Sequence, residues 1–360
     1  MEYLLQSFTA CLQTLGPFKT YLPSYFAFLP EVEIGGKKYS IVRQLAEGGY
    51  SFVYLVRESV GTGEDGKQLE FALKKVLAAT PEQYSEAKLE IQLMTQLSHP
   101  NILPLLAHSV ANPRSAEGSL MHVLYMLFPL YQDGSLWDVV TALALQGRSL
   151  DWREALDIFR QTCRAVLALH RMRPAMAHRD IKPHNVLLQR RGHRREQRTT
   201  ALQNAAEAEA LQSRHGPSPT SYQAVLMDFG SARPAHVTVR NRTEALMLQE
   251  DAEKLCTAPY RAPELFDVAS QCTVDERIDV WSLGCLLYFM LYGCSPFERV
   301  LEEAGGSLAL AVINGSVSFP AEDRQPKEPR MLVQMCLNTD PQTRPFVEDI
   351  LQEAERILVA

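Results

Sequence analysis

Lys74 and Glu90 are the first residues along the chain whose types and setting point to chemistry. A helix is predicted to begin after Thr80, because TPEQ combines an N-cap threonine, a proline at the first helical position and a capping glutamine. Within that helix Glu90 falls inside an apolar stripe at helical spacing, made of Ala87, Ile91, Met94 and Leu97. A buried carboxylate needs a cationic partner. Lys74, in the strand-like run FALKK, is the natural candidate, and such a pair would position a lysine on phosphate oxygens.

Further along, one stretch holds several chemically useful residues at fixed spacing. AHRDIKPHN matches H-R-D-x-K-x-x-N through His178, Arg179, Asp180, Lys182 and Asn185. A chance match to this pattern in a chain of this length has a probability of roughly one in ten thousand. MDFGSA, with Asp228, Phe229 and Gly230, comes next, followed by CTAPYRAPEL, DVWSLGC and DPQTRP. These elements in fixed order indicate a dedicated active site.

The stretch LAEGGYSFVYLV has several interpretations when taken alone. A phosphate-binding loop of the G-x-G-x-x-G kind would need three glycines, whereas Ala46, Gly48 and Ser51 occupy those places here. The stretch is a phosphate cradle, an eroded cradle in an inactive protein, or a β-turn.

Two regions of different secondary structure must position these residues. The runs YSIVRQL, YSFVYLVRESV, EFALKKVL, ILPLLAHSV and HVLYMLFPL have strand-like composition. Beyond Asp133 the patterns are helical, with DWREALDIFRQTCRAVLALH and then DVWSLGCLLYFMLYG, which is apolar on all sides and so predicts a buried helix. We expect a small sheet-rich lobe, a short connector and a larger helical lobe.

Composition excludes several classes of protein. The 360 residues are 46% apolar and 22% charged, which is ordinary for a globular chain with two lobes. A net charge of −6 argues against a nucleic-acid partner. Seven scattered cysteines without a CxxC pair predict reduced thiols in the cytoplasm, and neither a disulfide framework nor a zinc site.

The chain resembles the eukaryotic protein kinases over residues 39–358, and within them the Numb-associated kinase family. EGGYSFVYLV, SHPNIL, HRDIKPHNVLL, LCTAPYRAPELF and VDERIDVWSLGCLLY carry the resemblance. It implies an α+β, bilobal protein kinase fold with a small β-rich N-lobe and a larger helical C-lobe. The implied divisions are an N-terminal extension at 1–37 and a kinase domain at 38–358, with N-lobe 38–127, hinge 128–132, C-lobe 133–358 and an insertion at 189–223. The implied enzyme is a serine/threonine protein kinase that transfers the γ-phosphoryl group of ATP to protein hydroxyls, in membrane trafficking or signalling.

The resemblance also gives the motif residues roles in phosphoryl transfer, where catalysis is mostly positioning and charge neutralisation. Asp180 would orient the acceptor hydroxyl and take its proton, and Lys182 would neutralise charge on the γ-phosphoryl group. Asn185 and Asp228 would bind Mg²⁺ through oxygen. Thr257 would hydrogen-bond toward Asp180 and Lys182, in the pattern of serine/threonine rather than tyrosine kinases. We expect Thr257 to be structural, with a phosphosite as the alternative.

ATP would bind under the glycine-containing stretch. Lys74, held by Glu90, would contact the α- and β-phosphates, and Gly48 would lie where backbone approaches phosphate. Ser51 would add a hydroxyl near the γ-phosphate, whereas the Cβ of Ala46 would narrow its backbone angles and weaken ATP affinity. The implied ATP site comprises Leu45, Ala46, Glu47, Gly48, Gly49, Tyr50, Ser51, Val53, Ala72, Lys74, Glu90, Phe128, Leu130, Tyr131, Leu187 and Asp228. Among them Leu45, Val53, Ala72 and Leu187 would flank adenine, Phe128 would take the back-pocket position, and Leu130 and Tyr131 would follow Pro129 in the hinge.

Other motif residues have implied structural or regulatory roles. Glu264 and Arg344 would tie the activation segment to the helical lobe, and Asp279 would brace the catalytic loop. Phe229 and Gly230 would complete the loop that carries Asp228. An arginine in the place of Arg179 often pairs with a phosphate on the activation segment, which here contains Thr238 and Thr243. The same segment contains the helix-prone EALMLQEDAEKL, whose acids are alternative partners, so we expect it to order itself without an upstream kinase.

The N-terminus departs from the acylated members of the family, which begin Met-Gly. This chain begins Met-Glu, which argues against N-myristoylation at this start, and Cys11 alone predicts weak anchoring. MEYLLQSFTACLQTLG predicts a helix that packs on the protein body, with an interfacial membrane helix as the alternative. The family implies a cytoplasmic protein with peripheral contact to Golgi or endosomal membranes.

Two other functions compete with an active protein kinase. A pseudokinase would keep the fold as a binding module, but Lys74, Glu90, Asp180, Asn185 and Asp228 are all intact. A small-molecule kinase of similar fold is disfavoured by the APE segment and by DVWSLGC, which are typical of kinases that act on peptides.

Overall fold

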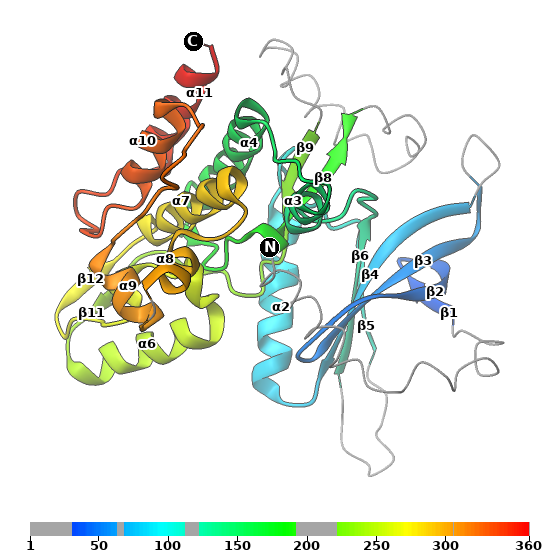
Figure 1. Ribbon diagram of the computed structural model, residues 1–360. Coiled ribbons are helices and arrows are strands. Elements are labelled where there is room, and N and C mark those ends of the chain that lie inside the picture. Colours follow the sequence, from blue (N-terminus) through cyan, green and yellow to red (C-terminus); the bar gives the residue numbers. More distant parts are fainter. Residues whose placement is uncertain (1–30, 63–67, 112–121, 192–221, 305, 360) are drawn as a thin grey trace.

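The computed structural model describes residues 31–62, 68–111, 122–191, 222–304 and 306–359. A sheet formed by the first part of the chain lies beside a larger body of helices formed by the rest (Figure 1). The first part comprises β1 (Glu31–Ile34), β2 (Lys37–Gly48), β3 (Ser51–Thr62), β4 (Gln68–Ala78), α2 (Pro81–Gln96), β5 (Ala107–Ala111) and β6 (His122–Pro129). The α+β, bilobal fold class predicted from the sequence is confirmed.

The second part begins with α3 and alternates short and long elements. They are α3 (Leu136–Leu145), α4 (Trp152–His170), β7 (Met176–Ala177), η3 (Pro183–Asn185), β8 (Val186–Arg190), β9 (Tyr222–Leu226), β10 (Arg233–Pro234), β11 (Val237–Val239), α6 (Arg242–Leu255), η5 (Ala258–Tyr260), η6 (Pro263–Leu265), β12 (Cys272–Val274), α7 (Arg277–Tyr292), α8 (Pro296–Ala304), α9 (Leu308–Asn314), α10 (Lys327–Cys336) and α11 (Val347–Val359).

The sheet of the first part is six-stranded and antiparallel, in the order β1-β2-β3-β4-β6-β5. Strand β1 starts at Glu31, so the sheet already begins within the segment predicted as an extension. EVEI is too short for a sequence pattern to reveal. The run ILPLLAHSV was predicted as a strand throughout, but β5 begins only at Ala107. Pro104 in this run has no N–H to donate to a ladder, which explains the late start.

Helix α2 begins where the capping pattern predicted. The Thr80 hydroxyl accepts the N–H of Gln83 at 3.3 Å, and the Gln83 side chain accepts the N–H of Thr80 at 3.2 Å. Such a reciprocal cap satisfies backbone donors that the first helical turn leaves free. The helix buries the apolar face that carries Glu90.

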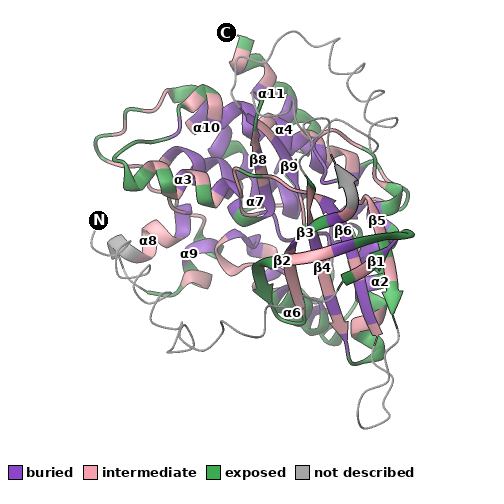
Figure 2. Cartoon of the chain, turned by 90° about the vertical axis from the view of Figure 1, so that its right-hand side faces the viewer, coloured by how far each residue is buried: buried purple, intermediate pink, exposed green. Residues whose placement is uncertain are grey.

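The helical region is organised around α7, which is buried on every side from Arg277 to Leu291, as its sequence predicted. Helices α4 and α10 pack against it, and α11 packs against α4. Figure 2 shows the contrast between the lobes, since buried residues dominate the helices while much of the sheet is half-buried or exposed. The chemistry-bearing loops around η3 and β9 therefore rest on a rigid core.

Several sequence predictions lie outside the described residues. These include Cys11, the predicted N-terminal helix, and most of the insertion at 189–223. Strand β8 runs to Arg190 and β9 starts at Tyr222, so the ends of that insertion belong to paired strands. Among the described residues, no helix has both the length and the apolar character needed to cross a membrane.

Candidate active site

Lys74 lies between two carboxylates that come from distant parts of the chain. Its Nζ is 2.7 and 3.0 Å from the two oxygens of Glu90 and 3.2 Å from Oδ1 of Asp228. Strand β4 holds the lysine and α2 holds Glu90, whose side chain is only 5% exposed. The ion pair predicted from the buried position of Glu90 is therefore present.

The charges of this trio reinforce one another. Burial alone would lower the pKa of Lys74, but the Glu90 and Asp228 carboxylates outweigh burial and raise that pKa above its ordinary value. The Lys74 charge in turn holds the pKa of Asp228 below its usual range. Burial raises the pKa of Glu90, and the attraction of Lys74 opposes that rise. Lys74 consequently keeps its charge beside the Asp228 carboxylate, whose side chain is 47% exposed.

Asp228 reaches Lys74 because its backbone is left-handed and its neighbours are fixed. Its φ is +63°, a conformation that non-glycine residues rarely adopt. Phe229 is buried and lies edge-on to the His178 ring at 5.2 Å. His178 Nε2 donates to the carbonyl oxygen of Met227 at 3.2 Å. These contacts on both sides of Asp228 hold its backbone in the left-handed conformation.

Asp180 is surrounded by the polar groups that the motifs predicted. Asn185 Nδ2 donates to its carboxylate at 3.0 Å and to its carbonyl at 2.8 Å. The Thr257 hydroxyl and backbone N–H donate to Oδ1 at 2.6 and 3.1 Å. Lys182 Nζ lies 2.8 Å from Asp180 Oδ2 and 2.8 Å from the Thr257 hydroxyl. The carboxylate is thus oriented by groups from the catalytic loop and from the segment before η5.

The catalytic loop, residues 178–185, is hydrogen-bonded to the buried helix α7 through Asp279. Its carboxylate accepts the backbone N–H groups of His178 and Arg179 at 2.7 and 2.9 Å, and the ring N–H of His170 at 2.9 Å. Burial would raise the pKa of Asp279, but the hydrogen bond and charge of His170 outweigh burial and lower it. The bracing predicted for Asp279 is present. Its hydrogen bond from the backbone N–H of Arg179 helps to hold that residue in a left-handed conformation, with a φ of +69°.

A second buried pair joins the segment after η5 to the end of the chain. Arg344 Nη1 and Nη2 lie 2.8 and 2.9 Å from the two carboxylate oxygens of Glu264, in the two-pronged geometry that guanidinium favours. The Arg344 side chain is completely buried and its guanidinium lies over the Trp281 ring. This is the tie that the sequence predicted.

The glycine-containing stretch forms the turn between β2 and β3. Gly48 pairs with Ser51, and Gly49 has a φ of +50°, so the turn requires glycine at position 49. The Ser51 hydroxyl donates to the Gly48 carbonyl at 3.0 Å and closes the turn. Ala46 pairs with Val53 inside β2 and has no positive φ, so the predicted restriction of its backbone is not seen. Glu47 and Tyr50 are exposed on either side of the glycines.

The residues predicted around adenine lie on β2, β3, β4, the end of β6 and β8. Phe128 is buried and pairs with Ala72 across β4 and β6. Leu187 forms a β-bridge with Ser135, next to the end of the hinge. Val53 and Leu187 are half-buried, Leu45 is 36% exposed at an irregular point of β2, and Leu130 and Tyr131 are half-buried after β6. The apolar side chains thus come from both lobes, and their place around adenine stays a prediction.

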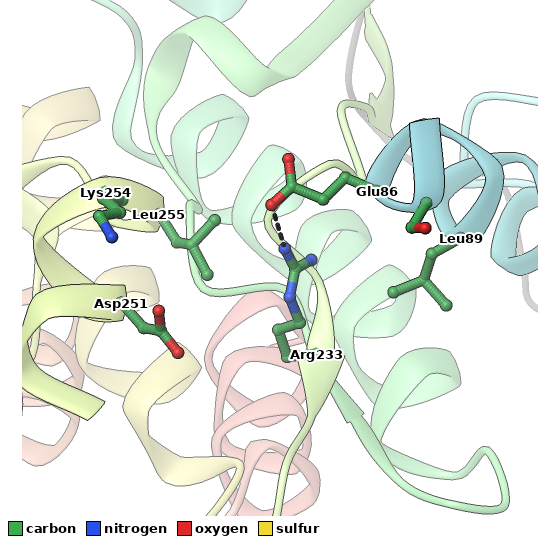
Figure 3. Close-up of a pocket in the computed structure, with 7 residues that line it drawn as sticks. Glu86, Leu89, Arg233, Asp251, Lys254 and Leu255 are labelled. Carbon is green, nitrogen blue, oxygen red and sulfur yellow. Dashed lines mark ion pairs between the residues drawn. The ribbon is translucent and has the colours of Figure 1, made fainter. Parts of the chain in front are cut away.

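The segment that contains α6 lies across a cleft from α2 beside the reaction centre. Figure 3 shows the cleft between them, of about 400 Å³, with Glu86 of α2 directed at Arg233. Arg233 Nη2 is 3.7 Å from the Glu86 carboxylate, and its Nη1 donates to the carbonyls of Gly230 and Ala232 at 2.9 Å. Ser85, Leu89, Asp251, Lys254 and Leu255 complete the lining. The α2 helix is therefore linked to the Asp228 loop by Arg233 as well as by Lys74.

Arg179 is buried near this cleft with only 6% of its surface exposed. Its Nε has no hydrogen-bond partner among the described residues. Burial lowers its pKa, while the charges of Asp279 and Asp251 oppose that effect and Arg233 adds to it. Helix α6 thus brings a carboxylate, Asp251, within electrostatic reach of Arg179.

The sequence reasoning missed three residues with clear structural roles. Glu86 precedes Glu90 by one helical turn, and that spacing could have identified it. His170 ends the amphipathic run of α4 on its buried side. Arg233 carries no local signal, because its partner lies on a helix far away in the sequence.

The chain is similar to known proteins along most of its length. The family model described as protein kinase domain matches residues 39–354. Serine/threonine-protein kinase 16 of Rattus norvegicus is 36% identical over 326 residues, covering 91% of this chain and 92% of that protein. The protein of that name from Homo sapiens is 35% identical with the same coverage. Serine/threonine-protein kinase ENV7 of Saccharomyces cerevisiae is 30% identical over 342 residues, covering 89% and 92%.

Proposed function

The chain belongs to the protein kinase family, and on that premise we propose that it is an active serine/threonine kinase that uses Asp180, Lys182, Asn185 and Asp228 for phosphoryl transfer. Its relatives that span nine tenths of the chain are named serine/threonine-protein kinases. The substrate is the hydroxyl of a protein serine or threonine, and the donor is ATP. Catalysis consists of holding donor and acceptor in line while charge is neutralised.

The observation that carries the proposal is the position of Lys74 between Glu90 and Asp228. In kinases of this family the lysine–glutamate pair and the metal-binding aspartate must be in place together. Here a single Nζ contacts both carboxylates at 2.7 and 3.2 Å. A module that had lost the chemistry would have no need to keep a half-buried lysine aligned between a buried and an exposed carboxylate.

The donor set fits a divalent metal, which members of the family use together with ATP. Asp228 supplies a carboxylate, and Asn185 gives its amide nitrogen to Asp180, which leaves its amide oxygen as the atom able to bind a cation. Among the described residues, no group of three or more His, Cys, Asp or Glu side chains could hold a metal ion alone. Two oxygen ligands suit Mg²⁺, which keeps waters and binds phosphate oxygens for the remainder. When bound there, the ion would neutralise charge on the phosphates.

The remaining roles fall to the protein. Lys74 contacts the phosphates of ATP with a charge that its two carboxylates keep in place. Asp180 accepts the hydrogen bond of the acceptor hydroxyl and takes its proton as the acceptor oxygen bonds to the γ-phosphorus, while the bond from that phosphorus to the bridging oxygen breaks and ADP leaves. Lys182, already against Asp180, stabilises the charge that develops on the transferred group. The Thr257 hydroxyl contacts both Asp180 and Lys182 and so fixes their positions relative to each other.

The test is protein phosphorylation and ATP turnover by the wild type against Lys74→Met and Asp180→Asn. We expect both variants to lose nearly all activity, and Lys74→Met to lose ATP affinity as well. Gln352→Ala, at an exposed position of α11, is the control and should retain activity. Equal residual activity in all proteins would refute the proposal.

A role in membrane trafficking, with peripheral contact to Golgi or endosomal membranes, is a separate proposal supported only by the family resemblance. Fractionation of the full chain against a version that starts at Glu31, which keeps all of β1, tests it. Equal distribution of both between cytosol and membranes would count against a membrane role for the N-terminal segment.

A further inference from the structure

A second cleft, which we call the α2–β5 groove, lies on a different face of α2 from Glu86 and Leu89. It has a volume of about 580 Å³ and runs between α2 and β5, which lie side by side (Figure 1). Buried Ile91 of α2 and Leu124 of β6 form its apolar floor, and Val110 of β5, 44% exposed, forms one wall. The other residues that line it are Tyr84, Lys88, Gln92, Thr95, Gln96 and His108.

The α2–β5 groove has the length of a short helix. Its α2 wall extends from Tyr84 to Gln96, a rise of about 18 Å at about 1.5 Å per residue. The Tyr84 ring at one end is held by the His122 ring, with the two centroids 4.1 Å apart. An apolar floor with a polar rim is the surface on which an amphipathic helix binds. The groove therefore suits one helix of about twelve residues.

The chain itself contains a segment of this kind, which lies outside the described residues. The sequence predicts a helix in MEYLLQSFTACLQTLG, where Leu4, Phe8, Cys11, Leu12 and Leu15 share one face. A helix of the twelve residues from Leu4 to Leu15 would be about 18 Å long. Its length and its apolar stripe match the groove.

Charge favours the groove over a lipid surface for this segment. Glu2 is its one charged residue before Lys19, so the predicted helix contains no lysine or arginine. A helix that binds an anionic membrane surface needs such cations on its polar face. The groove is lined by Lys88 and, among the described residues, by no acid. A nearly uncharged segment that begins with an acid suits this lining.

The segment joins the described part of the chain close to the groove. Strand β1 starts at Glu31 and contacts β5, the edge strand of the sheet, whose His108 and Val110 line the groove. The residues 16–30 extend to about 50 Å, which is enough to pass around that edge. A short tether holds its segment at an effective concentration on the order of millimolar. Docking within one molecule is thus favoured over docking between molecules at micromolar concentrations.

We propose that residues 4–15 dock as a helix in the α2–β5 groove of the same molecule, with their apolar face on the groove floor and on Val110. The docked segment covers apolar surface that β5 otherwise exposes. It also packs on α2, the helix that carries Glu90. This docking does not depend on the proposed kinase function.

Cross-linking of the full chain through Cys11 tests the proposal. Gln92→Cys places a second thiol on the exposed rim of the groove, and Gln352→Cys places one on exposed α11 as the matched control. Each protein is treated with a short bismaleimide at micromolar concentration, and the same variants with Cys11→Ser measure the reaction of the other cysteines. We expect the link from Cys11 to position 92 to form at least about tenfold faster than the link to position 352, because docking concentrates Cys11 at the groove.

Two further variants separate docking from chance collision. Val110→Glu puts a charge on the groove wall, and Phe8→Asp puts one on the apolar face of the segment without changing the kinase domain. Each should slow the link to position 92 by about tenfold, the order expected when one apolar side chain is lost from a contact. Val359→Glu, at a position 89% exposed, is the control and should leave the rate unchanged.

The remaining outcomes would overturn the proposal. Equal rates at positions 92 and 352, or a rate that neither Val110→Glu nor Phe8→Asp changes, would show that the segment does not occupy the groove. Cross-links between two chains in place of links within one would assign the groove to the segment of a second copy. None of these measurements reads phosphoryl transfer, so their failure would leave the proposed function standing.

Discussion

Arg344 and Glu264 are joined by two parallel hydrogen bonds of 2.8 and 2.9 Å, with the arginine side chain fully buried. Arg344→Met would leave the Glu264 carboxylate, only 14% exposed, without its partner. We expect a loss of about 3–5 kcal/mol in the free energy of unfolding, because an uncompensated buried charge is costly. Urea unfolding measures it. The double variant Glu264→Leu with Arg344→Met should recover part of the loss, and a single variant as stable as the wild type would contradict the argument.

The Thr257 hydroxyl bridges Asp180 and Lys182, so its removal should affect the chemical step. Thr257→Val keeps the size of the side chain and the backbone N–H, but loses the hydroxyl contacts of 2.6 and 2.8 Å. We expect kcat to fall about ten- to hundredfold, the cost of a hydrogen bond between charged groups and their partner, with little change in the KM for ATP. Thr257→Ser retains the hydroxyl and should stay near wild type. If the Ser variant loses as much activity as the Val variant, the hydroxyl contacts alone do not account for the role of Thr257.

Gly49 and Ala46 should respond in opposite ways to exchange between glycine and alanine. Gly49→Ala places a Cβ at a φ of +50°, which should cost about 1–2 kcal/mol and raise the KM for ATP by distorting the turn. Ala46→Gly should leave the KM for ATP nearly unchanged, because Ala46 already has ordinary strand backbone paired with Val53. ATP titration of both variants decides. A markedly lower KM in Ala46→Gly would show that the missing first glycine does weaken binding.

Activity should not depend on phosphorylation of the segment between Gly230 and Leu255. Helix α6 is already formed and places the Asp251 carboxylate near enough to Arg179 to add a small electrostatic attraction, in the direction in which a phosphate would act. Protein expressed in bacteria and treated with phosphatase should therefore retain its activity. Asp251→Asn should reduce activity several-fold, whereas Glu250→Gln, next to it on exposed α6, should not. A phosphatase-treated enzyme that stays inactive until another kinase is added would overturn this account.

His99 should make the fold sensitive to mild acid. Burial lowers the pKa of His99 to about 4, and its Nδ1 accepts the backbone N–H of Asn101 at 3.2 Å. The unfolded chain binds this proton near the ordinary value of 6.5 while the folded chain does not. The contribution is therefore complete above pH 6.5 and is lost as pH falls toward 4, by up to about 3 kcal/mol. Unfolding at pH 7.5 and 5 should show a smaller difference for His99→Asn, which keeps an acceptor that does not titrate. An equal difference would refute it.

Much of the site followed from the sequence because its signals are local. The capping pattern of TPEQ, the apolar stripe around Glu90 and the apolar length of α7 each depend on residues close together in the chain. Fixed motif spacing placed Asp180 and Asn185 in one loop, whereas the contact of Thr257 with Asp180 came from the family resemblance.

The remainder depends on contacts between distant segments, which a single sequence does not reveal. The late start of β5 follows from Pro104 and from pairing with β6, and the link between Arg233 and Glu86 exists only once α2 lies against the Asp228 loop. The Ser51 hydroxyl closes its own turn in the structure. The residue type predicted a hydrogen-bonding role for Ser51, but not that its partner would be the Gly48 carbonyl oxygen.

Hydrogen bonds to Asp279 should slow the amide hydrogen exchange of the catalytic loop to the rate of the buried core. Its carboxylate accepts two amide hydrogens of that loop, and α7, from which it extends, is the most deeply buried helix described. Amides whose partners open only when the domain unfolds exchange with solvent at the slowest rates. The amides of His178 and Arg179 should therefore be protected in deuterium for as long as those of α7, and longer than those of the β2–β3 turn. The two sides of the reaction centre would then open on different timescales. The catalytic loop, next to the acceptor, would open slowly, and the β2–β3 turn, next to the nucleotide, would open fast.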